Sequence, residues 1–368
     1  MSEYNFPFTK TENPMEKPDQ NNLGFGNYFT DHMFLMDYSE GEGWHNGRIV
    51  PYAPIPVDPV ACILHYAQGV FEGLKAYAAP DGGINLFRPY ENAKRSNASS
   101  GRMCIPPIDE ELYVEAVKAA VRADAGWVPE ADGTSLYIRP FIIGTEAFLG
   151  VRPAKEYIFG IVMSAVGSYY KEGLNPTRIF VEDEYVRSAP GGAGFAKTGG
   201  NYAASLLSLE KAKKAGCSQV LWLDGAERKY IEEIGTSNAF FVEDGTVYTP
   251  SLTGTILPGI TRSAVISLLE SWGVKVVESR FTIEGLFEAH SQNRLSEVFA
   301  TGTAAVISPV GEILWKGQSI IVNGGETGPL ARRLYDTLTG IQSGRLEDPF
   351  SWVVKVQEAQ NAGCQSED

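Results

Sequence analysis

The sequence predicts a protein of two domains, a smaller α+β domain followed by a larger domain of mixed α/β structure. The chain has 368 residues, whereas an ordinary domain has roughly 100 to 200. Hydrophobic residues make up 43% and charged residues 21%, so each part can bury a core of its own. A segment rich in Gly, Pro and Lys, at residues 171–176, separates two halves in which strand-like and helix-like runs are arranged differently.

In the N-terminal half, residues 1–24 are polar, contain proline and lack sustained periodicity, and we interpret them as an arm. Short apolar runs then predict strands at residues 84–87, 135–143 and 157–163. Helical spacing of apolar residues predicts helices at residues 91–102 and 110–125. We therefore assign residues 1–170 to a small N-terminal α+β domain.

Residues 171–184 are expected to connect the two domains. Beyond them, strands are predicted at residues 219–223, 239–242, 274–277, 297–300 and 320–322. Helices are predicted at residues 203–215, 261–272, 283–293 and 329–339. This alternation indicates mixed α/β packing and assigns residues 185–368 to a larger C-terminal domain.

Charge and cysteine content exclude several classes of protein. The net charge of -14 argues against nucleic-acid binding, which needs clustered Lys and Arg. The four cysteines lack metal-ligand spacing, so neither a metal site nor a disulfide framework is expected. The longest apolar run, at residues 158–166, is too short to span a membrane. With no secretory signal pattern, we expect a cytoplasmic protein.

The chemistry of the chain is expected at Lys197, in the glycine-rich run GGAGFAKTGGNY at residues 191–202. No other ionisable side chain occurs between Pro190 and Asn201. Poor solvation of an ammonium group favours the neutral, nucleophilic amine. Such an amine can condense with an aldehyde, and pyridoxal 5'-phosphate is the commonest biological aldehyde held in this way.

Pyridoxal phosphate also needs an acid at its ring nitrogen and donors at its phosphate, and each has a candidate. The acid is Glu233, for which a solvated acidic turn is the structural alternative. Residues 257–262 predict a helix N-terminus that can bind phosphate, or else an ordinary Pro-Gly turn. Residues 300–305 offer hydroxyl and N–H groups to phosphate or carboxylate, or else form a simple turn between strands.

Two arginines could bind anions. Arg95 lies on a predicted helix, where it contacts a phosphate or is a surface charge. Arg139 interrupts an apolar strand and must face solvent or an anion. A competing pattern, GxxxxAKT at residues 191–198, is one substitution from a nucleotide-binding P-loop. Ala196 replaces the required glycine, residues 185–190 form a poor strand, and Gly199 and Gly200 should delay the helix.

The motifs together resemble those of branched-chain amino acid aminotransferases of pyridoxal phosphate fold type IV. They are AKTGGNY at residues 196–202, YIEEIGTSN at 230–238, LPGITR at 257–262 and TGTAAVISP at 301–309. The N-terminal half agrees, with FTDHM at residues 29–33, HYAQGVFEGLKAY at 65–77, LFRP at 86–89 and YIRP at 137–140. The resemblance implies a D-amino acid aminotransferase-like fold, with a C-terminal pseudo-barrel, and a homodimer. Mammalian members carry a CxxC where this chain has AVIS, so no thiol switch is expected at residues 305–308.

The resemblance also implies roles for individual residues. Lys197 would be the catalytic residue, holding the cofactor and moving the substrate's proton. The residues implied to bind the cofactor are Arg95, Lys197, Tyr202, Glu233, Thr236, Ile260, Thr261, Thr301 and Thr303. Those implied to bind substrate are Phe25, Tyr66, Phe71, Tyr137, Arg139, Leu149, Val151, Tyr169, Thr303 and Ala304, with Leu149 and Val151 supplied by the partner subunit.

The implied reaction is a ping-pong transfer of the amino group between L-leucine, L-isoleucine or L-valine and 2-oxoglutarate, with L-glutamate and branched-chain 2-oxo acids as the other reactants. Apolar walls favour the branched side chains by desolvation, while Arg139 and tyrosine hydroxyls accommodate a second carboxylate. Two other fold type IV enzymes, D-amino acid aminotransferase and aminodeoxychorismate lyase, are alternatives. A P-loop-like nucleotide-binding module is a remote one.

Overall fold

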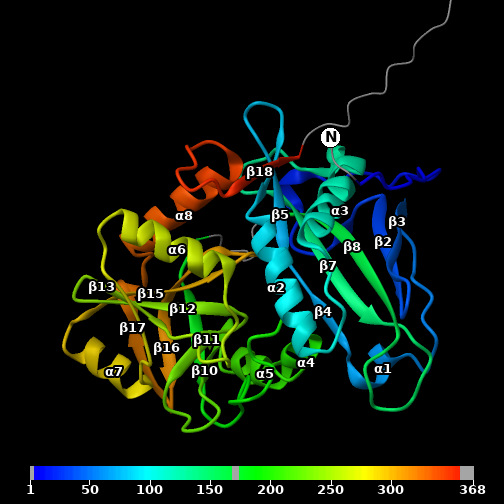
Figure 1. The fold of residues 1–368 in the computed structure, drawn as a ribbon. Helices are drawn as coiled ribbons and strands as arrows, with labels where there is room; N and C mark the ends of the chain where they lie inside the picture. The colour runs from blue at the N-terminus through cyan, green and yellow to red at the C-terminus, as the bar shows by residue number, and fades with distance from the viewer. Residues whose placement is uncertain (1–3, 168–173, 357–368) are drawn as a thin grey trace, which may run out of the picture.

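The computed structural model describes residues 4–167 and 174–356 and contains two nine-stranded sheets. Figure 1 shows the sheets in separate halves of the molecule, with helix α2 (Pro89–Arg102) at the boundary between them in this view. The predicted class of mixed α and β structure is confirmed.

The first sheet is antiparallel in all its described pairs, in the order β18-β6-β5-β7-β8-β2-β3, with β1 on β8 and β4 on β7. Its strands are β1 (Tyr28–Phe29), β2 (His32–Ser39), β3 (Gly43–Pro51), β4 (Gly69–Phe71), β5 (Leu74–Ala78), β6 (Ile84–Phe87), β7 (Ser135–Gly144), β8 (Glu156–Val166) and β18 (Val353–Val356). Strand β7 alternates: Leu136 and Ile138 are buried in the core, whereas Tyr137 and Arg139 face the other way.

The helices of this half are α1 (Cys62–Tyr66), α2, α3 (Glu110–Ala123), and the short 3-10 helices at Gln20–Asn22 and Ala125–Trp127. Helix α3 begins where the side chain of Asp109 accepts a hydrogen bond from the backbone N–H of Leu112. Acidic residues in its first turn and Arg122 in its last complement the helix dipole. Its apolar face, which includes Val114 and Val117, packs into the core of the first sheet.

The second sheet closes on itself. Its order is β11-β10-β9-β16-β15-β12-β13-β14, and β11 also pairs with β12, so six strands form a barrel. The strands are β9 (Thr177–Glu182), β10 (Gln219–Leu223), β11 (Ile231–Ile234), β12 (Ser237–Glu243), β13 (Thr246–Pro250), β14 (Val276–Ser279), β15 (Leu295–Gly302), β16 (Val306–Trp315) and β17 (Gln318–Ile321), which pairs with β16. Strand β9 is parallel to both of its neighbours, which makes the sheet mixed.

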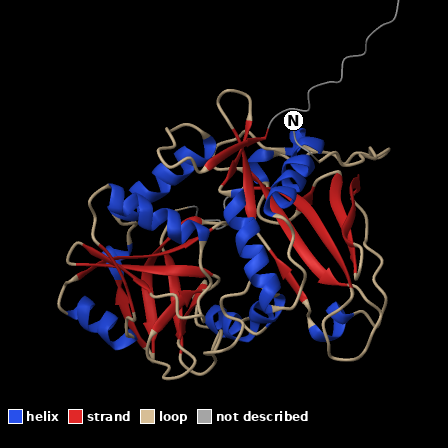
Figure 2. Cartoon of the chain, viewed as in Figure 1, coloured by secondary structure: helices blue, strands red, loops and turns tan. Residues whose placement is uncertain are grey.

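The helices of the second half are α4 (Gly199–Ala203), α5 (Leu206–Lys214), α6 (Ile260–Ser271), α7 (Ile283–Ser291), α8 (Pro329–Ser343) and a 3-10 segment at Val322–Gly325. Figure 2 shows α6 and α8 along the upper side of the second sheet. Phe87, the last residue of β6, and Trp352, directly before β18, pack in the same apolar core as residues of these two helices. The two halves therefore share apolar packing.

Several predicted elements match those observed. Strands at residues 84–87 and 219–223 have the predicted bounds, and the strands and helices expected at 135–143, 157–163, 91–102, 261–272 and 283–293 occur with small shifts at their ends. Strands β2 and β3 were not predicted. Residues 33–36 of β2 form a buried apolar run that was a signal for a strand, whereas β3 mixes apolar with polar residues. The helix expected at residues 203–215 is two helices, α4 and α5, and it begins earlier, at Gly199.

The domain division at residues 171–184 stays a prediction, and two strands bear on its placement. Strand β9 occupies residues 177–182 of the expected connection, and β18, near the C-terminus, pairs with β6 of the first sheet. No helix in the described ranges is long and apolar enough to cross a membrane. Within the same ranges, no group of three or more His, Cys, Asp or Glu side chains could hold a metal.

Candidate active site

Residues from both sheets meet at a cavity of about 370 Å³. Strands β4 and β7 and the segments beside them supply Phe71, Tyr137 and Arg139 from the first half. The second half supplies Lys197 and Tyr202. The remaining lining residues are Phe25, Gly73, Gln219, Ile234, Thr236, Ser237, Gly302, Thr303, Ala304 and Ala305. Most of the side chains predicted to bind substrate therefore lie around one space.

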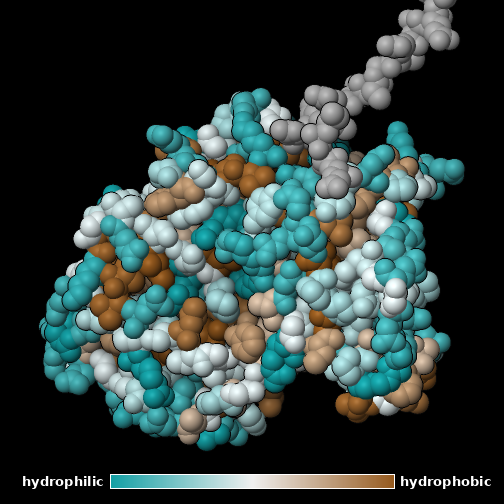
Figure 3. Space-filling model, viewed as in Figure 1, coloured by the Kyte–Doolittle hydropathy of each residue, from teal (hydrophilic) through white to brown (hydrophobic). Residues whose placement is uncertain are grey.

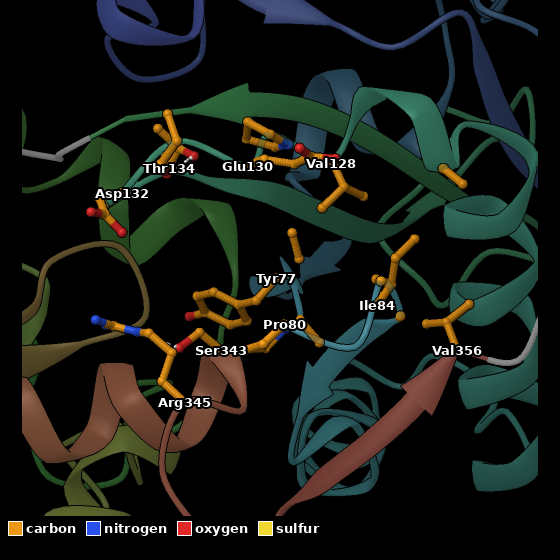
Figure 4. Close-up of a pocket in the computed structure, with 18 of the residues that line it drawn as sticks. Tyr77, Pro80, Ile84, Val128, Glu130, Asp132, Thr134, Ser343, Arg345 and Val356 are labelled. Carbon is orange, nitrogen blue, oxygen red and sulfur yellow. Dashed lines mark hydrogen bonds between the residues drawn. The ribbon is translucent and has the colours of Figure 1, made fainter.

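A larger cavity, of about 680 Å³, lies between the β5–β6 turn, residues 128–134 and the end of α8. Figure 4 shows Tyr77, Ser343 and Arg345 on one side of it and Glu130 and Thr134 on the other. None of the predicted site residues lines this cavity. The chemistry of the lining, and not the volume, identifies the active-site candidate.

The side chain of Lys197 is half-buried and points among aromatic rings. Its Nζ lies 2.9 Å from the hydroxyl of Tyr202, and 5.0 Å from the ring centre of Phe71. The backbone fixes the residue on both sides, since its N–H donates to the hydroxyl of Ser99 and its carbonyl accepts from the N–H of Phe71. No carboxylate in the described ranges forms an ion pair with it. The amine is thus presented to the cavity.

Glu233 is buried, with 1% of its surface exposed, on strand β11. The alternative of a solvated acidic turn is therefore wrong. Arg187 Nε lies 2.6 Å from its Oε2, yet that oxygen accepts no aligned hydrogen bond from any described residue. Burial raises the pKa of the Glu233 carboxyl to about 7, and the positive charge of Arg187 opposes the rise. This acid can therefore exchange a proton with a basic nitrogen near neutral pH.

A second set of polar groups meets at the start of α6. No side chain caps this helix, so its first backbone N–H groups, at Ile260 and Thr261, are free to bind an anion. Both residues line a small space of about 20 Å³ together with Gly73 and Thr303. Two residues before Thr303, the hydroxyl of Thr301 is buried and has no hydrogen-bond partner among the described residues. The alternative was an ordinary Pro-Gly turn in which Thr261 or a neighbour caps the helix, and the structure shows no such side-chain cap.

Arg95 is buried on α2 and is not a surface charge. Its Nε and Nη2 each donate to Glu72 at 2.8 Å, and its Nη1 donates to the carbonyl of Pro258, just before α6. The guanidinium therefore lies beside the helix N-terminus predicted to bind phosphate. Its charge is already paired with Glu72, an interaction that the sequence did not predict.

Arg139 and Tyr137 lie side by side in the cavity. Arg139 donates to the hydroxyl of Tyr137 at 2.8 Å, and its guanidinium lies 4.9 Å from the ring centre of Phe71. The ring of Phe25 meets that of Tyr137 edge-on at 5.0 Å. An apolar wall and a cation therefore occupy the same cavity, which suits both apolar and anionic ligands.

Three predicted substrate residues lie outside the cavity of the single chain. Leu149 and Val151 are exposed, the latter by 86%, and the hydroxyl of Tyr66 donates to the carbonyl of Leu149. Figure 3 shows apolar surface near α1 and the neighbouring loop. Leu64 and Phe148, from the same segments, are also exposed. Tyr169 lies outside the described residues.

The P-loop alternative fails on the residues around Lys197. Residues 185–190 do not form a strand, as predicted, and the hydroxyl of Thr198 donates to the carbonyl of Gly69 instead of facing an open loop. The prediction that Gly199 and Gly200 delay the helix was wrong, because α4 begins directly at Gly199. The first turn of a helix leaves its N–H groups without intrahelical partners in any case, so glycine is tolerated there.

Several residues that line or contact the site were not predicted. Gln219, Ile234 and Ser237 line the cavity, and Glu72, Lys75, Ser99 and Arg187 contact residues of the site. The run VFEGLKAY placed two charged residues among apolar ones, which was a signal that at least one of them is buried and paired. Arg187 and Ser99 carried no local signal. They reach the site only because the fold brings distant segments together.

Comparison with known proteins shows the family to which the chain belongs. Residues 69–313 match the family described as Amino-transferase class IV. The chain is 54% identical over 348 residues to branched-chain-amino-acid aminotransferase 2 of Bacillus subtilis, with 95% of each chain covered. Among solved structures, the branched-chain amino acid aminotransferase of Escherichia coli matches with a TM-score of 0.73 and 30% identity, covering 89% of this chain and 99% of that one. The branched-chain aminotransferase of the thermophilic archaeon Thermoproteus uzoniensis, solved with norvaline, matches with a TM-score of 0.73 and 27% identity, covering 89% and 100%.

Proposed function

This chain belongs to the class IV aminotransferases and is a branched-chain-amino-acid aminotransferase, and from that premise we propose how its residues perform the reaction. The substrates are L-leucine, L-isoleucine and L-valine as amino donors and 2-oxoglutarate as acceptor, with L-glutamate and branched-chain 2-oxo acids as products. The proposal rests on one observation above all. Lys197, which forms no ion pair with a carboxylate of residues 4–167 or 174–356, lines the cavity. The buried acid Glu233, next to the lining residue Ile234, lies near enough for the lysine's charge to lower its pKa.

The residues present fit pyridoxal 5'-phosphate, the cofactor of this family. When bound, it supplies a reactive carbonyl and an electron-withdrawing ring. Oε2 of Glu233 accepts no hydrogen bond from the described residues and can therefore accept one from a protonated ring nitrogen. The free N–H groups at the start of α6 can bind a phosphate. The buried, unpartnered hydroxyl of Thr301 is a further donor at that end. Arg95, beside Pro258, adds positive charge.

Lys197 and Tyr202 are the pair that handles protons. Lys197 Nζ would hold the cofactor through its aldehyde and would carry the proton that leaves the substrate's α-carbon. Tyr202, whose hydroxyl lies 2.9 Å from this amine, would also contact the phenolic oxygen of the cofactor. Thr236 and Thr303 complete the polar contacts on the cavity wall.

One cavity accepts two kinds of substrate in turn. Phe25 and Phe71 provide apolar surface for branched side chains, which bind by desolvation. The guanidinium of Arg139 provides the charge for the second carboxylate of 2-oxoglutarate or glutamate. The backbone N–H groups of Thr303 and Ala304, with the hydroxyl of Tyr137, bind the α-carboxylate common to all substrates. A ping-pong cycle follows from this shared site.

We further infer that the enzyme is a homodimer. The exposed apolar residues of α1 and the following loop, Leu64, Phe148, Leu149 and Val151, are the surface proposed to meet the second subunit. Leu149 and Val151 would then wall the partner's cavity, with Tyr66 beside them. A cytoplasmic location belongs to the same proposal and is supported by the free thiols of Cys62, Cys104 and Cys217.

Two measurements test the proposed function. Borohydride reduction of the yellow holoenzyme, followed by peptide mapping, should place the label on Lys197; a label on another lysine would overturn the assignment. A substrate panel should show transfer from L-leucine to 2-oxoglutarate and none from D-alanine. Activity with D-alanine alone would favour a D-amino acid aminotransferase, and release of pyruvate from aminodeoxychorismate would favour the lyase.

A further inference from the structure

Lys75 is a buried cation that the mechanism above does not use. It lies on β5 opposite Tyr137 in the register of the first sheet, and only 7% of its surface is exposed. No carboxylate of the described residues forms an ion pair with it, and burial lowers the pKa of its ammonium group to about 8. A buried charge without a counter-ion is costly, so a compensating interaction is expected from its surroundings or from a ligand.

The partner of Lys75 lies in the other half of the molecule. Its Nζ donates to the backbone carbonyl of Ala304 at 2.8 Å. Ala304 belongs to the turn at residues 303–305, which connects β15 to β16 and lines the active-site cavity. A second cavity, of about 430 Å³, borders both Lys75 and Ala304, and Lys75 also lines the small space beside Ile260 and Thr261. The lysine therefore holds the turn through the carbonyl of Ala304.

The backbone is strained at the end of this turn, and the N–H groups of the turn are free to donate hydrogen bonds. Val306, directly after it, has a φ of 61°, a left-handed conformation that β-branched residues rarely adopt. The backbone N–H groups of residues 303–305 donate to no acceptor in the described chain. A segment with this strain needs support from its neighbours, and its free donors are available to an anion.

We propose that Lys75 is a positioning residue for the substrate's α-carboxylate: it fixes the turn at residues 303–305, which holds the N–H groups of Thr303 and Ala304 in place, and it makes the third donor of the turn, the N–H of Ala305, stronger. This inference rests on the proposed function. A cation that bonds to the carbonyl of Ala304 polarises the peptide group of which the N–H of Ala305 is the other end. Its charge also stabilises an anion bound at the turn, because the side chain of Lys75 is buried and its field is weakly screened.

The other cations near the cavity are engaged differently. Arg95 is paired with Glu72, and Arg139 donates to Tyr137 and stacks on Phe71. Arg139 faces the cavity directly and suits the second carboxylate of a dicarboxylate substrate. Lys75 acts through the turn and so affects every substrate, because every substrate carries an α-carboxylate.

The test measures, by calorimetric titration of the holoenzyme, the affinities of two ligands that differ only in this carboxylate. The probes are 4-methylpentanoate, which has leucine's carbon skeleton without the amino group, and the neutral 4-methylpentan-1-ol. Lys75→Met should weaken binding of the acid about tenfold or more and leave binding of the alcohol within about twofold. Lys75→Gln, which keeps a donor without the charge, should be intermediate. Lys75→Arg should restore binding of the acid, and the neighbouring cavity has room for the larger side chain.

Lys213→Met is the matched control, because it removes one formal charge from the exposed face of α5 and should change neither affinity. The inference is overturned if Lys75→Met binds the acid as tightly as the unmodified enzyme, or if both probes lose affinity equally, which would indicate a structural role. Should Lys75→Met fail to fold, the ratio of acid to alcohol affinity in Lys75→Gln and Lys75→Arg decides in the same way. Failure of the unmodified holoenzyme to bind the acid or turn over L-leucine would instead reject the proposed function.

Discussion

The buried ion pair between Glu72 and Arg95 makes a quantitative prediction possible. Glu72 is 1% exposed and accepts four hydrogen bonds: two from Arg95 at 2.8 Å, one from Asn92 at 2.7 Å and one from the N–H of Gly73 at 3.1 Å. Glu72→Gln keeps the size of the side chain and one acceptor oxygen. It removes the negative charge and directs an amide N–H toward groups that are themselves donors.

The expected loss is large because Arg95 is then left buried without a counter-ion. Removing one partner of a buried pair costs about 3–5 kcal/mol. The two hydrogen bonds from Arg95, worth about 1.5–3 kcal/mol each while charge-assisted, are either lost or deprived of that charge, which is consistent with this range. Since a domain is stable by only about 5–15 kcal/mol, the variant should unfold at a clearly lower urea concentration. We expect its free energy of unfolding to fall by about 3–5 kcal/mol.

The assay is urea unfolding of the apoenzyme, so that cofactor binding by Arg95 does not enter. The control is the double variant Glu72→Gln with Arg95→Met, in which neither member of the pair is charged and the introduced amide oxygen still accepts from the N–H of Gly73. It should be less destabilised than Glu72→Gln alone, with a coupling energy of at least about 2 kcal/mol. A double variant whose loss equals the sum of the single losses would refute the reasoning.

The pair also has a pH dependence with a definite sign. Burial raises the pKa of Glu72, but the charge and hydrogen bonds of Arg95, with the charge of Lys197 and the hydrogen bond from Asn92, together lower it by more, so that the folded-state pKa lies below the ordinary 4.5. The stability that it contributes is therefore present above pH 4.5 and is lost as the pH falls through the lowered folded-state value. The difference in stability between the unmodified protein and Glu72→Gln should shrink over that range, and a constant difference would contradict the assignment.

Three further predictions concern catalysis and assembly. Lys197→Ala should abolish transamination, by about 10²–10⁴-fold or more, without a change in the circular dichroism spectrum, and Lys229→Ala is the control; full turnover in Lys197→Ala would reject its role. Glu233→Gln should lower kcat about 10²-fold while Glu227→Gln, at an exposed position, leaves it unchanged, and equal kcat values for the two variants would show that Glu233 does not act on the ring. Val151→Asp should shift the sedimentation velocity from dimer toward monomer and lower activity with it, and an unchanged dimer would count against the proposed interface.

Local sequence patterns predicted the elements that depend on nearby residues. The strand at residues 219–223 is an uninterrupted apolar run after Gln219 that stays buried in the barrel, and α7 begins where Thr282 caps it, so both could be predicted from spacing and capping alone. The central strand β9 could not. It carries Arg178 and Glu182, and what makes it a strand is parallel pairing with β10 and β16, from distant parts of the chain.

The same distinction holds for the site. The sequence by itself determined which chemistry this protein carries, because Lys197 in its glycine-rich run, Glu233 and the helix start at Ile260 are each identified by their immediate neighbours. Only the tertiary structure decided the electrostatic state of these groups, since burial and charge pairing depend on contacts between residues far apart in the chain. Arg187 beside Glu233 and Lys75 at the carbonyl of Ala304 are such contacts, and no local pattern encodes them.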